Sequence, residues 1–200
     1  MNRLILASSS PRRKSLLESI GYHPYKIVVP NIDEEPFKKE LPVQLVERLA
    51  IDKATKIAED YPDDIVLAAD TVKARGRLII SKPKDKPEAV KFLKMLSGRR
   101  HTVYTGVCVA KGEKRVCKIV QTKVKMKLLT DEEIKCLIQS NEWRDKAGAY
   151  ALQGVGGAYI SWINGSSSNV RGLPVHEVYK ILNGLGLKQR GLDEQYSIEN

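Results

Sequence analysis

The stretch from residue 4 to residue 17, LILASSSPRRKSLL, constrains the fold more than any other part of the chain. Its first four residues form an apolar run that is too short for a helix and is typical of a strand covered on both faces. Ser10 can cap a following helix, and Pro11 suits its first position. The polar and basic side chains of residues 8–13 therefore lie at a strand-to-helix junction, where free backbone N–H groups favour an anion. A phosphate-binding turn and a solvated charged loop both remain open at this point.

The composition indicates a globular α/β protein of one domain. Lys+Arg 34 against Asp+Glu 24 gives a net charge of +10, which favours an anionic partner or reflects a lysine-rich proteome. No apolar run approaches the length of a membrane span, and the N-terminus lacks the apolar core of a signal peptide. Cys108, Cys117 and Cys136 show no CxxC spacing, so we expect reduced, largely structural thiols in a cytoplasmic protein.

Hydrophobic periodicity predicts helices and strands that alternate along the chain, with no linker rich enough to divide it. We expect a single domain of two lobes over residues 1–187 and a flexible C-terminal tail over residues 188–200. Residues 164–169 are expected to form a flexible loop. The predicted strands cover residues 4–7, 25–29, 65–69, 78–80, 102–110, 116–129 and 159–163, and the predicted helices after the first cover residues 41–58, 85–96, 130–138 and 174–182.

Three polar features stand out from this pattern. Lys53 lies on the apolar face of the predicted helix 41–58, where a charge either reaches out to solvent or meets an anion. Asp70 and Thr71 directly follow the predicted strand 65–69, and the ligand crevice of an open α/β sheet lies at the carboxyl ends of such strands. An aspartate that caps a turn is the other interpretation. Glu34 lies in an acidic segment that is either a solvated loop or a source of metal ligands.

Several kinds of catalytic site are poorly supported. The three histidines show no metal-binding spacing, and neither a Walker loop nor a dinucleotide-binding fingerprint occurs. No serine lies in a G-x-S-x-G turn. The remaining cations and carboxylates suit phosphoanhydride chemistry, in which cations neutralise a polyphosphate and carboxylates hold a divalent metal and orient water. These candidates are Arg12, Arg13, Lys53, Lys82, Glu34 and Asp70.

Eight strings occur in a fixed order along most of the chain: ASSSPRR, IDEE, RLAIDKA, AADT, SKP, LSGRRHTVYTGV, DKAGAYALQG and NVRGLP. Together they resemble the Maf family of nucleoside triphosphate pyrophosphatases. The resemblance implies an α/β fold related to the inosine triphosphatases, with a curved mixed β-sheet flanked by helices and two lobes with a central cleft. It also implies hydrolysis of the α–β phosphoanhydride, a requirement for Mg²⁺ or Mn²⁺, and a homodimer.

The resemblance assigns roles to individual residues. Asp70 would be the proton acceptor that activates water, with Lys53 and Lys82 as further catalytic cations. Asp70 and Glu34 would hold the metal. Ser8, Arg12 and Arg13 would bind phosphates, and Arg12, Thr71 and Gln153 fall where the family separates its substrate classes. The AADT and YALQG strings resemble the dTTP/UTP type.

Three departures from the family pattern concern loop shape and the breadth of substrate choice. Ser81 stands where glycine is usual, Lys73 and Arg75 bring charge to a commonly apolar segment, and Trp143-Arg144 replaces a common Glu-Pro string. Two alternatives stay open: a pyrophosphatase for 7-methyl-GTP or another modified nucleotide, and a basic nucleic-acid-binding regulator of division. The scattered basic residues favour the nucleotide substrate, with neither a membrane nor a nucleic acid as the expected partner.

Overall fold

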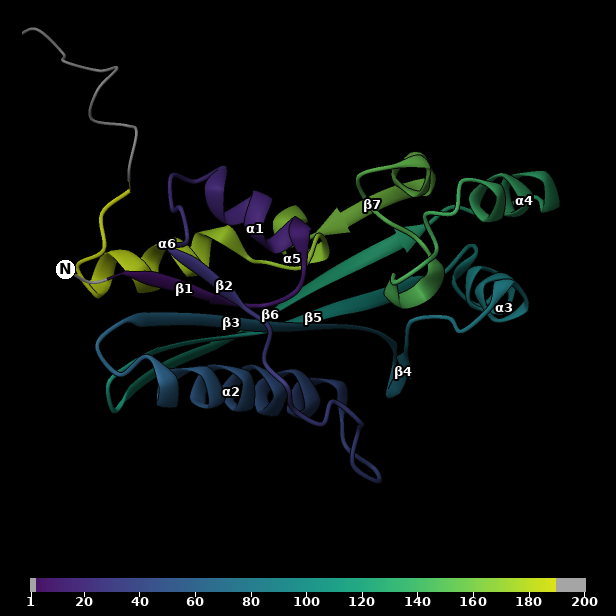
Figure 1. Cartoon of the computed structure of the whole chain (residues 1–200). Helices are drawn as coiled ribbons and strands as arrows, with labels where there is room; N and C mark the ends of the chain where they lie inside the picture. Colours follow the sequence, from purple (N-terminus) through teal and green to yellow (C-terminus); the bar gives the residue numbers. More distant parts are fainter. Residues whose placement is uncertain (1–2, 190–200) are drawn as a thin grey trace, which may run out of the picture.

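The computed structural model describes residues 3–189 and shows a seven-stranded mixed sheet between layers of helices (Figure 1). The strand order is β2-β1-β3-β5-β6-β7, and the short β4 pairs with β3 off this path. β1 is parallel to β2 and β3, whereas the other pairs are antiparallel. The strands are β1 (Leu4–Ala7), β2 (Lys26–Val28), β3 (Ile65–Arg75), β4 (Leu78–Ile80), β5 (Arg100–Lys111), β6 (Lys114–Met126) and β7 (Ile160–Asn164).

The helices cover the two faces of the sheet unequally. In Figure 1, α2 (Pro42–Asp60) lies along one face, whereas α1 (Pro11–Glu18), α5 (Ser167–Val170) and α6 (Val175–Gly184) lie on the other. α3 (Lys86–Leu96) and α4 (Asp131–Gln139) lie together at the far end of the long strands, and the 3₁₀ segments are η1 (Ala147–Ala149) and η2 (Val155–Tyr159). None of the helices between residues 3 and 189 is long and apolar enough to cross a membrane.

Separate hydrophobic clusters lie at the two ends of the molecule. Near β1, the apolar side chains of α1 and α6 pack on one face of the sheet, and those of α2 pack on the other. A further cluster joins α3 and α4 to the segment that contains Trp143 and Tyr150. These clusters form the core of the mixed α/β fold that the sequence predicts. The predicted C-terminal tail lies outside the described residues from residue 190 onward.

Two predictions about the chain path are wrong. β3 does not end at Ala69 but continues to Arg75, because it stays paired with β5 through Ala74 and Thr102. Residues 164–169 are not a flexible loop, since α5 begins there and Asn169 is fully buried. The Asn169 amide donates to the carbonyl oxygens of Val103 and Val120, which fixes α5 against the two longest strands.

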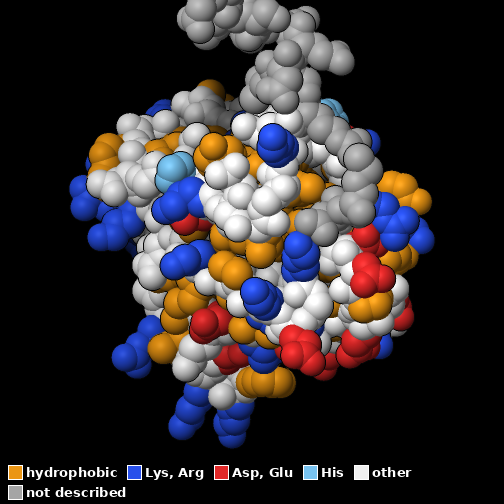
Figure 2. Space-filling view, turned by 90° about the vertical axis from the view of Figure 1, so that its left-hand side faces the viewer, with side chains coloured by type: hydrophobic (Ala, Val, Ile, Leu, Met, Phe, Trp, Pro, Cys, Tyr) orange, Lys and Arg blue, Asp and Glu red, His pale blue; other side chains and the backbone are white. Residues whose placement is uncertain are grey.

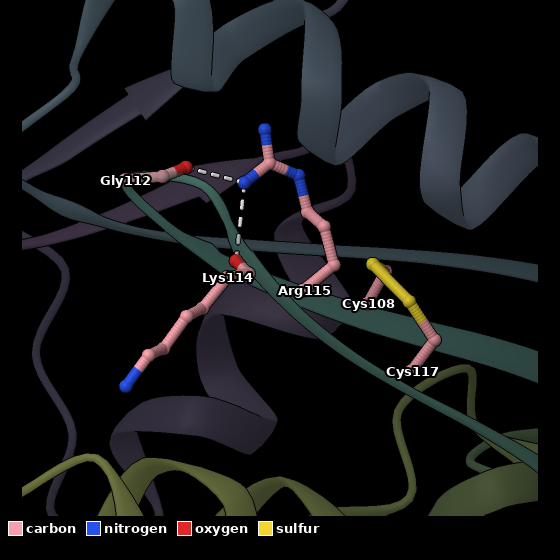
Figure 3. The surroundings of a disulfide bond; sticks show 5 residues. All are labelled: Cys108, Gly112, Lys114, Arg115 and Cys117. Atoms are coloured by element: carbon pink, nitrogen blue, oxygen red, sulfur yellow. Dashed lines mark hydrogen bonds between the residues drawn. A yellow bond between two sulfur atoms is a disulfide. The ribbon is translucent and has the colours of Figure 1, made fainter.

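The prediction that all three cysteines are reduced is wrong for two of them. Cys108 of β5 and Cys117 of β6 form a disulfide, with their Cα atoms 4.1 Å apart (Figure 3). The hairpin register places these two residues directly opposite each other, which brings the sulfur atoms together. Cys136 is free and exposed.

Candidate active site

The site is centred on a break in the pairing along one edge of β3. On this edge β1 pairs as far as Ala68, and β4 pairs from Lys73 onward. Asp70 and Thr71 lie between these two partners. The chain leaves β1 toward Ser8 and α1, and it leaves β4 in the direction of Asp70 because β4 is antiparallel to β3. Two loops that are far apart in the sequence therefore reach the same part of β3.

Asp70 and Thr71 point to opposite faces of the sheet, because side chains alternate along a strand. Asp70 faces α2, where it meets Lys53. Thr71 faces the side of α1, where its hydroxyl contacts Arg13. The sequence interpretation placed Asp70 at the end of a strand. It instead lies within β3, just past the end of the neighbouring parallel strand β1, and this keeps the carboxylate at the open edge.

Lys53 is the cation closest to the carboxylates. Its ammonium lies 2.6 Å from Asp70 Oδ1 and 2.8 Å from Glu34 Oε1. The Lys53 side chain is 6% exposed and that of Asp70 is 10% exposed, whereas Glu34 is 53% exposed. The apolar face of α2 therefore carries Lys53 inward to an anion, and the alternative of a lysine that reaches out to solvent is excluded. The sequence predicts Glu34 and Asp70 together as metal ligands, and their carboxylates both contact the same atom, the Nζ of Lys53.

Arg13 is held by three neutral acceptors. Its guanidinium donates to the carbonyl oxygen of Gly172 at 2.9 Å and to the hydroxyls of Ser8 and Thr71, both at 3.3 Å. Burial lowers the pKa of this guanidinium and the charge of Arg12 lowers it further, whereas the charges of Asp70 and Glu34 oppose both effects. None of its three acceptors is a carboxylate, so the positive charge is oriented without being neutralised by direct contact.

The turn after β1 is built around Ser8 rather than Ser10. Ser8 is 5% exposed, and its hydroxyl accepts from the backbone N–H of Ser10 at 3.2 Å as well as from Arg13. Ser10 occupies the predicted N-cap position, and Pro11 begins α1, but the Ser10 side chain makes no capping hydrogen bond. The backbone N–H groups of the first helical turn are thus left without a side-chain cap, at the end of α1 that favours anions.

Two of the predicted site residues, Lys82 and Gln153, make no hydrogen bond or ion pair with Lys53 or Asp70 within the described residues. Both side chains are exposed. Lys146, which the sequence interpretation missed, lies near two of the predicted cations. Burial lowers the pKa of its ammonium, and the charges of Arg12 and Lys82 lower it further. The signal that could have identified Lys146 is its place in the DKAGAYALQG string, seven residues before Gln153.

The carboxylates of Asp70 and Glu34 suit a hard divalent cation whose remaining ligands come from a bound substrate and water. Mg²⁺ in phosphoryl-transfer sites usually binds one or two protein carboxylates together with substrate phosphates and water. Asp70 and Glu34 supply two such carboxylates, since both present an oxygen to the same ammonium. No group of three or more His, Cys, Asp or Glu side chains that could hold a metal occurs in the described part of the chain. Metal binding would therefore depend on the oxygen atoms of a bound nucleotide.

Comparison with known proteins gives consistent matches over nearly the whole chain. A family model described as Maf-like protein matches residues 3–185. A dTTP/UTP pyrophosphatase of Cereibacter sphaeroides is 47% identical over 184 residues, which cover 92% of this chain and 95% of that protein. A nucleoside triphosphate pyrophosphatase of Anaplasma phagocytophilum is 46% identical, with 92% and 96% covered. A dTTP/UTP pyrophosphatase of Sphingopyxis alaskensis is 47% identical, with 94% and 98% covered.

Proposed function

The chain belongs to the Maf family, and on this premise we propose that it hydrolyses dTTP and UTP to the nucleoside monophosphate and pyrophosphate. The observation that carries the proposal is the contact of Lys53 with both Asp70 and Glu34 at the open edge of β3. Carboxylates that can orient water and cations that can bind a polyphosphate thereby occur together, as phosphoanhydride hydrolysis requires. The relatives named dTTP/UTP pyrophosphatase support this pair of substrates.

In the proposed reaction a water oxygen attacks the α-phosphorus, and the bond from that phosphorus to the oxygen bridging to the β-phosphate breaks. Asp70 accepts the proton of the attacking water, and pyrophosphate leaves with the bridging oxygen. Lys53 holds the Asp70 carboxylate in place and offsets negative charge that develops on the phosphoryl oxygens. We assign Arg13 and Ser8, which are hydrogen-bonded to each other, to the phosphate that is attacked.

The other cations would bind the rest of the triphosphate. The charges of Arg12 and Lys82 both lower the pKa of the Lys146 ammonium, so each of these two cations acts on the third. We assign these three side chains to the phosphate oxygens beyond the one attacked, because a leaving pyrophosphate carries most of the negative charge. A bound Mg²⁺ or Mn²⁺, held by Asp70 and Glu34, would add Lewis-acid polarisation of the phosphate oxygens.

We assign substrate choice to Thr71 and Gln153. The Thr71 hydroxyl accepts a hydrogen bond from the Arg13 guanidinium, which also donates to Ser8, and it lies 2.9 Å from the hydroxyl of Thr105. These contacts closely constrain the position of the Thr71 side chain. Gln153 is exposed on the segment between η1 and η2, where it is free to meet a nucleobase. The amide of Gln153 can donate to and accept from a pyrimidine edge, whereas a glutamate at that position could only accept.

A homodimer and a cytoplasmic location complete the proposal, both by family resemblance. A nucleic-acid-binding role has less support. On the face drawn in Figure 2, Lys and Arg side chains are interspersed with apolar and acidic ones, so this face offers no continuous basic track.

The test is a substrate panel with product identification. Initial rates would be measured for dTTP, UTP, CTP, ATP, GTP and 7-methyl-GTP, each with Mg²⁺, with Mn²⁺ and with a chelator. We expect kcat/KM for dTTP and UTP to exceed that for the purine nucleotides by about tenfold or more. The products should be the nucleoside monophosphate and pyrophosphate. A preference for 7-methyl-GTP would contradict the substrate assignment, and release of nucleoside diphosphate would contradict the position of cleavage.

A further inference from the structure

Lys73 is a buried lysine that the proposed reaction does not use. It lies on β3, three residues beyond Asp70, and is 5% exposed. Its ammonium donates to the backbone carbonyl of Tyr150 at 3.0 Å and lies 3.2 Å from the centroid of the Tyr150 ring. Both contacts that the described part of the chain gives this ammonium are to one residue, and neither is to a carboxylate.

A charge in this position is costly, so the contact with Tyr150 needs an explanation. Burial lowers the pKa of the Lys73 ammonium well below its ordinary value, and the charges of Arg12 and Lys146 lower it further. An apolar side chain of similar length would fill the same space at a lower desolvation cost. Lys73 therefore provides a hydrogen bond that an apolar residue could not, and within residues 3–189 the one polar group that accepts it is the Tyr150 carbonyl.

Tyr150 is also fixed at its other end. It is 1% exposed, and its hydroxyl lies 2.7 Å from His101 Nε2 on β5. The two rings meet edge to face, with centroids 5.6 Å apart. Gly148 packs on the stem of Lys73, since a Cβ added to Gly148 would lie 3.3 Å from the Lys73 Cδ. Side chains of the adjacent strands β3 and β5 thus hold the short segment from Gly148 to Tyr150 in place.

The segment from Gly148 to Tyr150 lies between two residues of the proposed site. Lys146 precedes Gly148 by two residues, and Gln153 follows Tyr150 by three. Gln153 itself is exposed. Its position relative to Thr71 consequently depends on how firmly the preceding segment is held against β3, the strand that also carries Thr71 and Asp70.

We propose that Lys73 is a positioning residue for substrate selectivity. Through its hydrogen bond to the Tyr150 carbonyl, it holds the segment that contains Lys146 and Gln153 at a fixed position relative to Thr71. The proposal rests on the pyrophosphatase function proposed above. Lys73 touches neither substrate nor metal in this account. Its ammonium anchors backbone that would otherwise move, and selectivity follows because a selecting side chain must be held in a fixed place.

The test compares Lys73→Met, which keeps the length of the side chain and removes the ammonium, with Lys125→Met at an exposed site on β6. Hydrogen–deuterium exchange would follow residues 146–153, and kcat/KM would be measured for dTTP and GTP. We expect Lys73→Met to exchange about tenfold faster in this segment, because one charge-assisted contact is lost. The preference for dTTP over GTP should fall about fivefold or more. The melting temperature should be kept or raised, since a buried charge has been removed.

The outcomes separate this inference from the proposed function. Unchanged exchange of residues 146–153 in Lys73→Met would overturn the anchoring, whatever the activity. Faster exchange with unchanged selectivity would overturn the link to substrate choice. A wild-type protein without turnover of any triphosphate would contradict the proposed function, and with it the selectivity part of the inference. If Lys73→Met does not fold, Lys73→Leu is tested by the same criteria, and failure of both to fold would show Lys73 to be a structural residue.

Discussion

Lys53 lies 2.6 Å from Asp70 and 2.8 Å from Glu34, so one buried ammonium joins carboxylates from two separate segments. Its contact with Asp70 is almost fully buried, whereas Glu34 is half exposed and its contact is weakened by solvent. Removal of either member of the buried pair leaves the other without its main counter-charge. Activity and stability are therefore linked at this pair, and the link can be measured.

Lys53→Met should lower kcat for dTTP by about a hundredfold or more, because the Asp70 carboxylate loses both its orientation and a nearby positive charge. The free energy of unfolding should fall by about 3 kcal/mol, since Asp70 stays buried. Chemical denaturation and initial rates measure the two effects. Lys56→Met on the same helix is the control, because Lys56 is 56% exposed and should be nearly neutral in both assays.

The double variant Lys53→Met with Asp70→Asn tests the pairing itself. It should be more stable than Lys53→Met alone, because no buried charge remains unpaired. Its loss of activity should be smaller than the product of the two single losses, since both side chains act as a unit. Additive effects on stability and on rate would contradict a coupled pair.

Arg13→Lys should lower kcat/KM for dTTP by about a hundredfold, although the charge is kept. A lysine cannot reproduce the fork that reaches Gly172, Ser8 and Thr71 together. Isothermal titration with a non-hydrolysable dTTP analogue should show weaker binding by a similar factor. The exposed Arg99→Lys serves as the control, and an Arg13→Lys enzyme with unchanged affinity would contradict the role of the fork.

Gly106→Ala should destabilise the protein by about 3 kcal/mol and also reduce activity. Gly106 pairs directly with Asp70 across the sheet, and an added Cβ would collide with the backbone carbonyl of Val46 in α2. α2 would have to move away from the sheet, and Lys53 would move with it. Thermal unfolding checks the loss, with Gly184→Ala as the control because no atom of residues 3–189 outside the helix's own backbone lies within 4 Å of a Cβ added there. Equal stability of the two variants would contradict this close packing.

His101 should stay neutral at pH values where ordinary histidines are protonated. Burial, together with the smaller effect of the Lys73 charge, lowers its pKa to about 3. The unfolded chain binds this proton below about pH 6.5 while the folded protein does not, so stability should fall as the pH drops from about 6.5 toward 3. His101→Gln should show a weaker pH dependence of the free energy of unfolding in this range. An NMR titration that shows protonation of His101 near pH 6.5 would contradict the prediction.

The parts of the site that depend on local rules could be predicted from the sequence. The apolar run of β1 and the proline at the start of α1 define the turn that holds Ser8, and the helical period of α2 places Lys53 on its buried face. The partners of Lys53 could not follow from periodicity, because Glu34 and Asp70 reach it only when a loop and β3 pack on α2.

The errors have physical causes of the same kind. The apolar run of β3 ends at Ala69, but pairing with β5 extends the strand past two charged residues to Arg75. The sequence shows Lys73 only as a charge in a commonly apolar segment, whereas its contact lies 77 residues away at Tyr150. The disulfide could have been inferred from the hairpin, since pairing of Lys111 with Lys114 sets Cys108 opposite Cys117.

The most direct test of the account is the rate of pyrophosphate release from dTTP by the wild-type protein and by Asp70→Asn, with the exposed Asp63→Asn as a matched control. Circular dichroism would first confirm that the variants are folded. We predict release by the wild type and by Asp63→Asn, and a fall of about a hundredfold or more in Asp70→Asn, because the proton acceptor is lost. An Asp70→Asn enzyme within tenfold of the wild-type rate would contradict the assignment of Asp70 as the general base.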